Sequence, residues 1–344
     1  RGQEGAGISV TDGERMKFHK GKGLVNEVFS EEALEGLTGH AAIGHVRYST
    51  QGDSDYANVQ PLVFRSQTDS LALAHNGNLV NATGLKYQLE AQGSIFQTTS
   101  DTEVLAHLIK RGGSLRFTEK VKNALSMIKG AYAFVILTED QLVIALDPNG
   151  LRPLSLGRLG EAYVVASETC AFDIIGAIYE RDVQPGELIV INNSGLYVER
   201  FSSSVERAMC SMEYIYFSRP DSNIEGINVH AARKRLGVEL AKESFVEADV
   251  VTGVPDSSIS AAIGFAEASG IPYELGLIKN RYVGRTFIQP SQELREQGVK
   301  MKLSAVRGIV EGKKVVMVDD SIVRGTTSRR IVNLLREAGA VEVH

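Results

Sequence analysis

The hydrophobic pattern of this chain changes near Phe201, and that change constrains the fold more than any other feature. Before it, residues 130–150 ("GAYAFVILTEDQLVIALDPNG") and 186–201 ("GELIVINNSGLYVERF") each place turn residues between two apolar runs, a pattern that predicts β-hairpins. After it, strand-like runs alternate with helix-like segments, which predicts a parallel sheet. We therefore expect two domains, residues 1–205 with an antiparallel sheet and residues 206–344 with a parallel sheet.

The individual elements follow from periodicity and from helix start and stop signals. In the first half we expect helices over residues 81–93 and 100–111. In the second half the expected helices and strands alternate: helix 229–246, strand 248–254, helix 258–269, strand 270–278, strand 315–318 and helix 327–338.

Charge and cysteine content limit the classes of function. The net charge of -5 argues against a dominant nucleic-acid surface. No apolar run approaches the roughly 20 residues that span a bilayer. The two cysteines, Cys170 and Cys210, make no disulfide framework and suit a reducing compartment. We expect a cytoplasmic protein with neither a nucleic-acid nor a membrane partner.

Two adjacent carboxylates follow the apolar run Val315–Val318, and "SIVRGTTS" leads from them into the next helix. The backbone N–H groups of residues 324–328 would open that helix, where unpaired donors and the helix dipole favour a phosphate. Gly325 lets the backbone approach closely, and three hydroxyls add donors: Thr326, Thr327 and Ser328. Asp319 and Asp320 suit vicinal ribose hydroxyls, with a divalent cation nearby. The structural alternative is a solvated turn with Thr326 as a helix N-cap.

Two further segments fit a pyrophosphate site. "TGVPDSS", residues 252–258, follows an apolar strand and offers a carboxylate, hydroxyls and backbone amides, although alone it is typical of a type I turn. Residues 279–304 form a polar stretch that would close as a lid over such a site, or simply be a solvated loop. Its cationic residues are Lys279, Arg281, Arg285, Arg295, Lys300 and Lys302.

Three motifs in the first half have structural alternatives of their own. "HVRYSTQG" (residues 45–52) holds Arg47, which could be an ordinary ion-pair residue. "HNGNLVN" (residues 75–81) contains an Asn-Gly pair at residues 76–77, the strongest short hairpin signal. "SDTEV" (residues 100–104) reads as an S-x-x-E capping box.

Together these three motifs resemble the glutaminase domain of class II, N-terminal-nucleophile amidotransferases. The resemblance implies that Arg47 binds the α-carboxylate of glutamine through paired hydrogen bonds and that Asp101 binds its α-ammonium group. It also implies an oxyanion hole made of the Asn76 side-chain amide and the Gly77 N–H.

The acidic turn resembles the phosphoribosyl-pyrophosphate (PRPP) motif of phosphoribosyltransferases. By that resemblance, Asp319 and Asp320 hold the ribose hydroxyls and contact Mg²⁺, and Ser257 is a further Mg²⁺ contact. The residues implied in PRPP binding are Asp319, Asp320, Ser321, Arg324, Gly325, Thr326, Thr327, Ser328 and Lys279.

Both halves on one chain resemble the family of glutamine phosphoribosylpyrophosphate amidotransferases. The implied fold is an αββα antiparallel sandwich of the Ntn-hydrolase type, followed by a type I phosphoribosyltransferase α/β domain with a parallel sheet. The implied reaction hydrolyses glutamine and passes ammonia through an internal channel. Ammonia then displaces pyrophosphate from PRPP to give 5-phosphoribosylamine, the first committed step of purine synthesis. The implied partners are Mg²⁺, purine nucleotide inhibitors and further copies of the chain, as a homodimer or homotetramer.

The family's nucleophile is a cysteine at the mature amino terminus, whose own α-amine acts as the base. "RGQEGAGI" (residues 1–8) resembles the segment just downstream of it, so we expect the nucleophile and the first strand to be absent from this chain. The carboxyl end, "VEVH", stops as another strand begins, so we also expect the second sheet to be incomplete. Such a chain should not hydrolyse glutamine but should keep some PRPP binding.

Cys210 matches a position at which one branch of the family holds a [4Fe–4S] cluster, together with three cysteines near the carboxyl end. Those three would lie beyond His344. The resemblance implies a possible cluster for the full-length protein but none that this segment could assemble.

Two alternatives stay open. Other class II amidotransferases, such as glucosamine-6-phosphate synthases and asparagine synthetases, share the first-half motifs but do not explain "DDSIVRGTTS". A regulator with a phosphoribosyltransferase fold would bind PRPP as an effector and nucleic acid as its target, which leaves the glutaminase motifs without a role. Salt-sensitive nucleic-acid binding would favour it.

Overall fold

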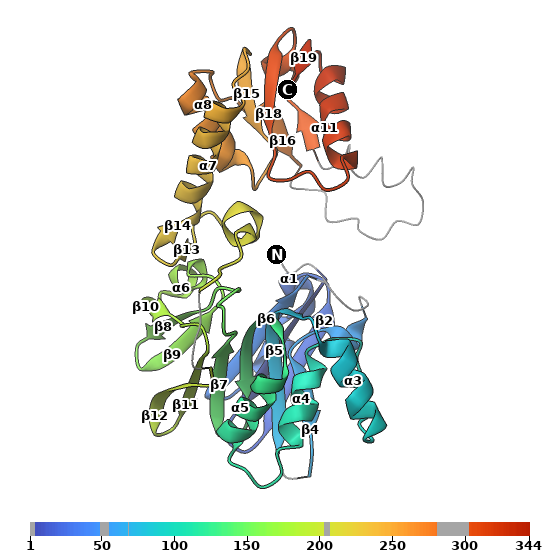
Figure 1. Ribbon diagram of the computed structural model, residues 1–344, viewed down its shortest axis with the longest axis vertical. Coiled ribbons are helices and arrows are strands. Elements are labelled where there is room, and N and C mark those ends of the chain that lie inside the picture. Colours follow the sequence, from blue (N-terminus) through green and yellow to red (C-terminus); the bar gives the residue numbers. More distant parts are fainter. Residues whose placement is uncertain (1–3, 49–54, 68, 203–206, 281–302) are drawn as a thin grey trace. The chain divides into compact units, whose positions relative to one another are not determined.

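The computed structural model describes residues 4–48, 55–67, 69–202, 207–280 and 303–344 (Figure 1). The chain divides into two compact units. Unit 1 comprises Arg1–Ser167 and Ile175–Cys210, and unit 2 comprises Glu168–Ile174 and Ser211–His344. The short segment Glu168–Ile174, which lies inside the first domain expected from sequence, therefore belongs with the second unit.

Unit 1 is built on a six-stranded antiparallel sheet with the order β12-β11-β7-β6-β5-β4 and two three-stranded sheets, β2-β1-β3 and β10-β8-β9. Its strands are β1 (Gly5–Thr11), β2 (Met16–Lys22), β3 (Ala41–Arg47), β4 (Leu62–Arg65), β5 (Ser70–Leu79), β6 (Gly130–Leu137), β7 (Gln141–Leu146), β8 (Ser155–Leu159), β9 (Ala162–Ala166), β10 (Ile178–Asp182), β11 (Glu187–Asn192) and β12 (Gly195–Arg200). Its helices are α1 (Val25–Val28), α2 (Glu31–Glu35), α3 (Ala82–Ala91), α4 (Glu103–Lys110) and α5 (Phe117–Met127), with a 3₁₀ turn at Tyr56–Asn58.

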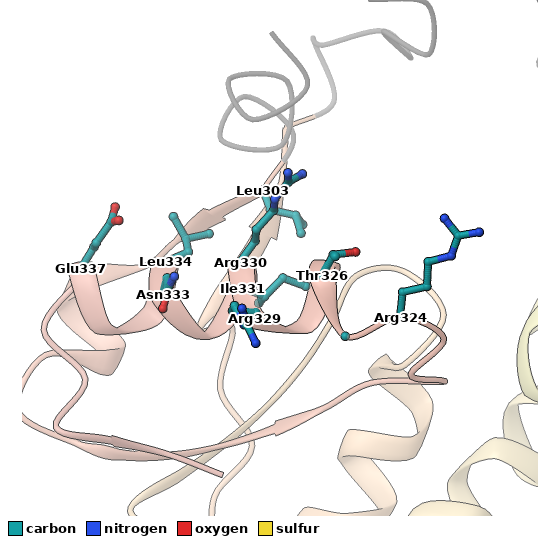
Figure 2. A pocket seen from close by; sticks show the side chains of 10 residues that line it. Leu303, Arg324, Thr326, Arg329, Arg330, Ile331, Asn333, Leu334 and Glu337 are labelled. Atoms are coloured by element: carbon teal, nitrogen blue, oxygen red, sulfur yellow. The ribbon is translucent and has the colours of Figure 1, made fainter. Parts of the chain in front are cut away.

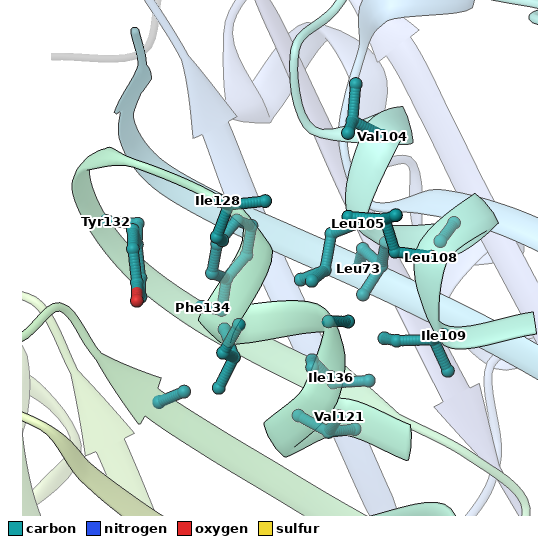
Figure 3. Packing of buried hydrophobic residues seen from close by; sticks show 14 of the residues in the cluster. Leu73, Val104, Leu105, Leu108, Ile109, Val121, Ile128, Tyr132, Phe134 and Ile136 are labelled. Atoms are coloured by element: carbon teal, nitrogen blue, oxygen red, sulfur yellow. The ribbon is translucent and has the colours of Figure 1, made fainter. Parts of the chain in front are cut away.

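Strand β5 is buried on both faces because successive side chains of a strand point in opposite directions. Leu71 and Leu73 face the helix layer of α3, α4 and α5, in the main core of the unit. Ala72 and Ala74 face the other way, into a cluster with Ile43 of β3. Figure 3 shows the main core, in which side chains of the six-stranded sheet pack against side chains of the helices. The six-stranded sheet is thus the middle layer, which fixes the residues of β5 firmly.

Both hairpins expected in this half are present: β6 pairs with β7 and β11 with β12, all antiparallel. Helices α3 and α4 lie within the ranges expected for them. Helix α5 was not anticipated, although its buried Val121, Ala124 and Leu125 recur at helical spacing.

Unit 2 contains the parallel sheet β15-β18-β19 and two small antiparallel pairs, β13-β14 and β16-β17. The strands are β13 (Asn223–Ile224), β14 (Ile227–Asn228), β15 (Val250–Gly253), β16 (Leu277–Lys279), β17 (Leu303–Ala305), β18 (Lys314–Val318) and β19 (Glu342–Val343). The helices are α6 (Cys170–Ile175), which begins in this unit, α7 (Val229–Glu243), α8 (Ile259–Ser269), α10 (Arg307–Val310) and α11 (Thr326–Glu337), with a π-helical turn at Glu213–Phe217.

Strand β18 was expected to be buried on both faces, and it is. Val315 packs with Ile331 and Leu335 of α11, whereas Val316 and Val318 pack with Phe265 of α8. Helices therefore cover both faces of the sheet, as a parallel sheet requires.

One expected strand differs. Residues 270–278 make only a single parallel bridge to β15, between Tyr273 and Val251. The chain then turns, and β16 pairs antiparallel with β17. Pro272 cannot donate to a ladder. The Gly276 N–H bonds to the Glu274 carbonyl at 2.9 Å and to the Thr252 side chain of β15 at 3.0 Å, and not to a backbone carbonyl of β15, so the ladder does not continue here.

Candidate functional sites

The parallel register of β15 and β18 brings two distant motifs to one edge of the sheet. Gly253 lies opposite Val318, and the Val254 N–H donates to the Val318 carbonyl at 2.9 Å. Both strands therefore end at the same level. The residues that follow them, "PDSS" after β15 and "DDS" after β18, meet beyond the carboxyl ends, where open α/β sheets bind ligands.

Serine hydroxyl groups donate hydrogen bonds to the two adjacent carboxylates at this edge of the sheet. The Ser257 hydroxyl donates to Asp320, and the Ser258 hydroxyl donates to Oδ1 of Asp319 at 3.3 Å. The Ser321 hydroxyl donates to Oδ1 of Asp320 at 2.7 Å. Burial, and secondarily the Asp320 charge, raise the pKa of Asp319. An acidic pair held this way is prepared to accept hydrogen bonds or a cation.

Lys279 reaches the same loop from β16. Its Nζ lies 2.6 Å from Oδ2 of Asp256, and both side chains are exposed. The expected cationic loop continues from here, but residues 281–302 lie outside the described part of the chain, so the lid stays a prediction.

Helix α11 begins at Thr326, and Gly325 precedes it with φ +69°. Gly325 is the N-cap residue and no side chain caps the helix, so Thr326 is not the N-cap that the structural alternative required. The first N–H groups of the helix have no intrahelical partner and open toward solvent beside the exposed Thr326 and Thr327. This is the arrangement that an incoming phosphate needs.

A pocket of about 450 Å³ lies along α11. Figure 2 shows Arg324 and Thr326 at the amino-terminal end of the helix and Arg330 and Leu334 further along it. Its remaining lining residues are Leu303, Gly325, Arg329, Ile331, Asn333 and Glu337. The pocket includes part of the expected phosphate cradle, but neither of the paired acids and not Ser257.

In unit 1, Asn76 and Gly77 lie within strand β5 and not in a hairpin turn, so the turn alternative is wrong. Gly77 has φ +152°. A Cβ built on it would lie 2.0 Å from the Ala131 carbonyl oxygen of β6 and 2.8 Å from Nε2 of His75. Only glycine therefore fits at this position of the sheet.

Asp101 lies beside these two residues. Its Oδ2 accepts a hydrogen bond from the Leu79 N–H at 2.7 Å, at the end of the strand that carries Asn76. The capping box expected here is absent, because the buried Glu103 carboxylate accepts from the Gln97 and Thr98 N–H groups at 2.9 and 2.7 Å. The other carboxylate oxygen of Asp101, Oδ1, lies 3.8 Å from Nδ1 of His75, the residue before Asn76.

Arg47 ends β3 and is buried. Two residues earlier, Nε2 of His45 lies 3.2 Å from the His75 carbonyl oxygen, which ties β3 to β5. Burial lowers the pKa of Arg47, while the charges of Glu4 and Asp101 oppose that shift. Arg47 and Asp101 are therefore close enough to interact electrostatically, as a pair that binds the two charged ends of an amino acid must be. Residues 49–52 of the same motif lie outside the described residues.

Sequence reasoning missed Arg152. It follows the turn "DPNGL" and donates two hydrogen bonds to the side-chain oxygen of Asn76, at 3.2 Å from Nε and 2.6 Å from Nη2. The sequence offered only a turn signal at this point, and nothing in it linked residue 152 to residue 76.

Comparison with known proteins agrees with this geometry. A family model described as a glutamine amidotransferase domain matches residues 45–173, which include Arg47, Asn76, Gly77 and Asp101. An amidophosphoribosyltransferase of Bacillus subtilis (strain 168) is 74% identical over all of this chain and 72% of that protein. One of Staphylococcus aureus (strain MRSA252) is 54% identical over all of this chain and 70% of that protein. The chain belongs to the amidophosphoribosyltransferase family.

Solved structures of amidophosphoribosyltransferases share the fold. One, described as the allosteric regulatory enzyme of purine biosynthesis, has a TM-score of 0.95 and 74% identity over all of this chain and 74% of that one. Another, the B. subtilis PRPP amidotransferase complexed with ADP and GMP, has a TM-score of 0.94 and 73% identity over all of this chain and 75% of that one. These relatives confirm the predicted family, the predicted fold class and the predicted amidophosphoribosyltransferase function. The domain boundaries and the roles of individual site residues stay predictions.

The cofactor expected from the sequence is Mg²⁺, which needs oxygen ligands. Among the described residues, no group of three or more His, Cys, Asp or Glu side chains is placed to hold a metal ion. Mg²⁺ commonly takes only one or two protein carboxylates and completes its shell with water and substrate phosphates. Asp319, Asp320 and the Ser257 hydroxyl are all oxygen donors and fit that requirement.

An iron–sulfur cluster finds no such fit within this sequence. A [4Fe–4S] cluster takes four thiolates, and the sequence contains two cysteines. Cys170 is buried, with its thiol pKa raised by that burial, and Cys210 is partly exposed. The cluster stays a prediction for the full-length protein.

None of the helices in the described residues has both the length and the apolar character needed to cross a bilayer.

Proposed function

We propose that the protein transfers the amide nitrogen of glutamine to PRPP, with glutamine hydrolysis in unit 1 and phosphoribosyl transfer in unit 2. Ammonia attacks C1 of PRPP, the bond from C1 to the pyrophosphate oxygen breaks, and pyrophosphate leaves with that electron pair. The nitrogen, which is protonated once it is bound to C1, then loses one proton to solvent. The product is 5-phosphoribosylamine. One observation supports the second site above all: Ser257 and Ser258 each hydrogen-bond one of the paired acids, Asp320 and Asp319.

In the proposed PRPP site, the Asp319 and Asp320 carboxylates accept hydrogen bonds from the ribose hydroxyls. The N–H groups at the start of α11, with the hydroxyls of Thr326, Thr327 and Ser328, receive the 5′-phosphate. Asp319, Asp320 and Ser257 would hold Mg²⁺, which would neutralise charge on the departing pyrophosphate. Lys279 would exchange the Asp256 carboxylate, with which it is paired, for a pyrophosphate oxygen.

In the proposed glutamine site, Arg47 binds the α-carboxylate and Asp101 the α-ammonium group. The Asn76 side-chain amide and the Gly77 N–H stabilise the oxyanion of the tetrahedral intermediate. Two supporting observations are the bond from the Leu79 N–H to Asp101 and the steric demand for glycine at residue 77.

We also propose the finer features that relatives suggest. The B. subtilis structure complexed with ADP and GMP supports inhibition of this protein by purine nucleotides. A homodimer or homotetramer, dependence on Mg²⁺ and a cytoplasmic location complete the proposal.

Titration calorimetry of PRPP with Mg²⁺ tests the PRPP site. Asp319→Asn and Asp320→Asn keep the shape but remove the charge, and each should weaken PRPP binding by at least tenfold, since hydrogen bonds to charged groups are worth about 1.5–3 kcal/mol. Asp173→Asn neutralises an exposed carboxylate elsewhere in unit 2 and should leave the affinity unchanged. If both variants at 319 and 320 bind as tightly as the wild type, the proposed site is wrong.

The glutamine site is tested separately in the full-length protein. Asn76→Ala should lower kcat of the glutamine-dependent reaction roughly 10²–10³-fold, as expected for the loss of one oxyanion-hole donor, and spare the reaction driven by added ammonia. Equal loss of both activities, or of neither, would contradict the assignment.

A further inference from the structure

The Arg152 guanidinium group binds the side-chain oxygen of Asn76. We infer that Arg152 is a positioning residue that orients the Asn76 amide for catalysis. The inference rests on the proposed glutamine site and adds a residue to it. Arg152 donates to Oδ1 of Asn76 through both Nε and Nη2, at 3.2 and 2.6 Å.

The chemistry of the two groups removes the usual ambiguity of an asparagine side chain. A primary amide can present its oxygen or its NH₂ to a neighbour, but a guanidinium group has donors and no acceptor. The amide oxygen of Asn76 must therefore face Arg152. Its NH₂ group then points the opposite way and is the part that can donate to an oxyanion.

A rigid turn holds Arg152 in place. The fully buried Asp147 accepts hydrogen bonds from the Asn149 N–H at 2.9 Å and from the Leu151 N–H at 3.0 Å. It also accepts from the Tyr132 N–H at 3.2 Å, and Tyr132 lies opposite Gly77 in the sheet. The turn is therefore anchored to the strand beside the oxyanion hole, which makes the position of Arg152 part of the same framework.

The positive charge of Arg152 also acts on the groups around the candidate oxyanion hole. It lies close enough to His75, the neighbour of Asn76, to be among the causes that lower the pKa of that imidazole, after burial as the main cause. A fixed cation bound to the amide oxygen also polarises the amide and makes its NH₂ group a stronger donor.

Glutaminase kinetics of Arg152 variants in the full-length protein test this role. Lysine offers only donors and keeps the amide oriented, whereas glutamine offers both a donor and an acceptor and permits either orientation. We expect Arg152→Lys to retain more activity than Arg152→Gln and Arg152→Met. For the last two, kcat for glutamine hydrolysis should fall roughly 10- to 100-fold, which is below the 10²–10³ of a lost donor, with KM for glutamine nearly unchanged.

Two controls separate positioning from damage to the fold. Arg158→Met removes an arginine that forms an ion pair with Glu180 on the surface and should not alter kcat. The ammonia-driven reaction should survive in every Arg152 variant.

The double variant Asn76→Ala/Arg152→Met decides whether Arg152 acts through Asn76. If it does, the double variant is no slower than Asn76→Ala alone. Additive losses, a normal kcat in Arg152→Met, or a loss expressed only in KM would each overturn the inference. An Asn76→Ala enzyme with the kcat of the wild type would instead overturn the proposed glutamine site itself.

Discussion

The Ser257 hydroxyl donates a hydrogen bond to the Asp320 carboxylate across 63 residues of sequence. The two residues meet because β15 and β18 run parallel and end at the same level. The bond links the loop after one strand to the loop after the other, and both loops are expected to bind PRPP.

Removal of this link should weaken the binding of PRPP with Mg²⁺. Ser257→Ala leaves the Asp320 carboxylate without one donor and removes an oxygen from the proposed Mg²⁺ site. The loss of one such bond is worth about 0.5–1.5 kcal/mol, so calorimetry should show an affinity roughly 2- to 13-fold lower. Ser269→Ala, at the end of α8, serves as the control, because the Ser269 hydroxyl bonds to the Ala266 carbonyl at 3.4 Å and to the Ile271 N–H at 3.3 Å and to neither of the paired acids. An unchanged affinity in Ser257→Ala would argue against the link.

Lys279 should matter for binding and not for stability. Its ion pair with Asp256 is exposed on both sides, and such pairs contribute little, about 0–1 kcal/mol. Lys279→Met should therefore leave the melting temperature within error but lower the affinity for PRPP at low salt, with a smaller difference at high salt because salt screens exposed charges.

The matched variant is Lys242→Met, which removes a lysine from a similarly exposed pair with Glu239 in α7. It should change neither stability nor binding. If both lysine variants bind PRPP alike, Lys279 has no role in the site.

Gly77 should tolerate no side chain. Gly77→Ala places a Cβ 2.0 Å from the Ala131 carbonyl oxygen at a backbone angle that favours glycine, so we expect unit 1 to lose about 3 kcal/mol of stability. Gly84 lies in α3 with nothing within 4 Å of its built Cβ, and Gly84→Ala should stabilise by up to about 1 kcal/mol. Denaturant titrations of the two variants compare these effects directly. Equal stability would show that the strand relaxes around the added methyl group.

Acid should destabilise unit 1 through His45. Burial is the main cause that lowers the pKa of this imidazole to about 4, and its buried Nδ1 has no hydrogen-bond partner among the described residues. In the unfolded chain the pKa is about 6.5. Between these values the unfolded state binds more protons, so stability is present above about pH 6.5 and falls by roughly 2–3 kcal/mol as the pH drops to about 4.

His45→Gln should flatten this dependence, because a glutamine amide can still donate to the His75 carbonyl oxygen and does not titrate. His40→Gln, at an exposed position, should leave the slope as in the wild type. Calorimetric melting at several pH values makes the comparison. A slope in His45→Gln as steep as in the wild type would assign the effect to other groups.

Much of unit 2 could be predicted because its signals are local. The run Val315–Val318 identified a strand buried on both faces, and the glycine and hydroxyls after it identified a helix start. In two places in unit 1 the local pattern predicted the wrong structure, because a contact with residues outside that pattern decided it. Asn76-Gly77 reads as a turn, but β6 pairs with both residues and keeps them in a strand. Glu103 reads as a capping residue, but the Gln97 and Thr98 N–H groups hold its carboxylate.

The sequence by itself determined the chemical character of both sites, because paired acids, a glycine before hydroxyls and an Asn-Gly pair each restrict what a short backbone segment can bind. Only the tertiary structure decided which partners complete them. The pairs Ser257–Asp320 and Arg152–Asn76 are 63 and 76 residues apart. Their contact depends on sheet register and on the course of the turns between them, which no local pattern of side chains specifies.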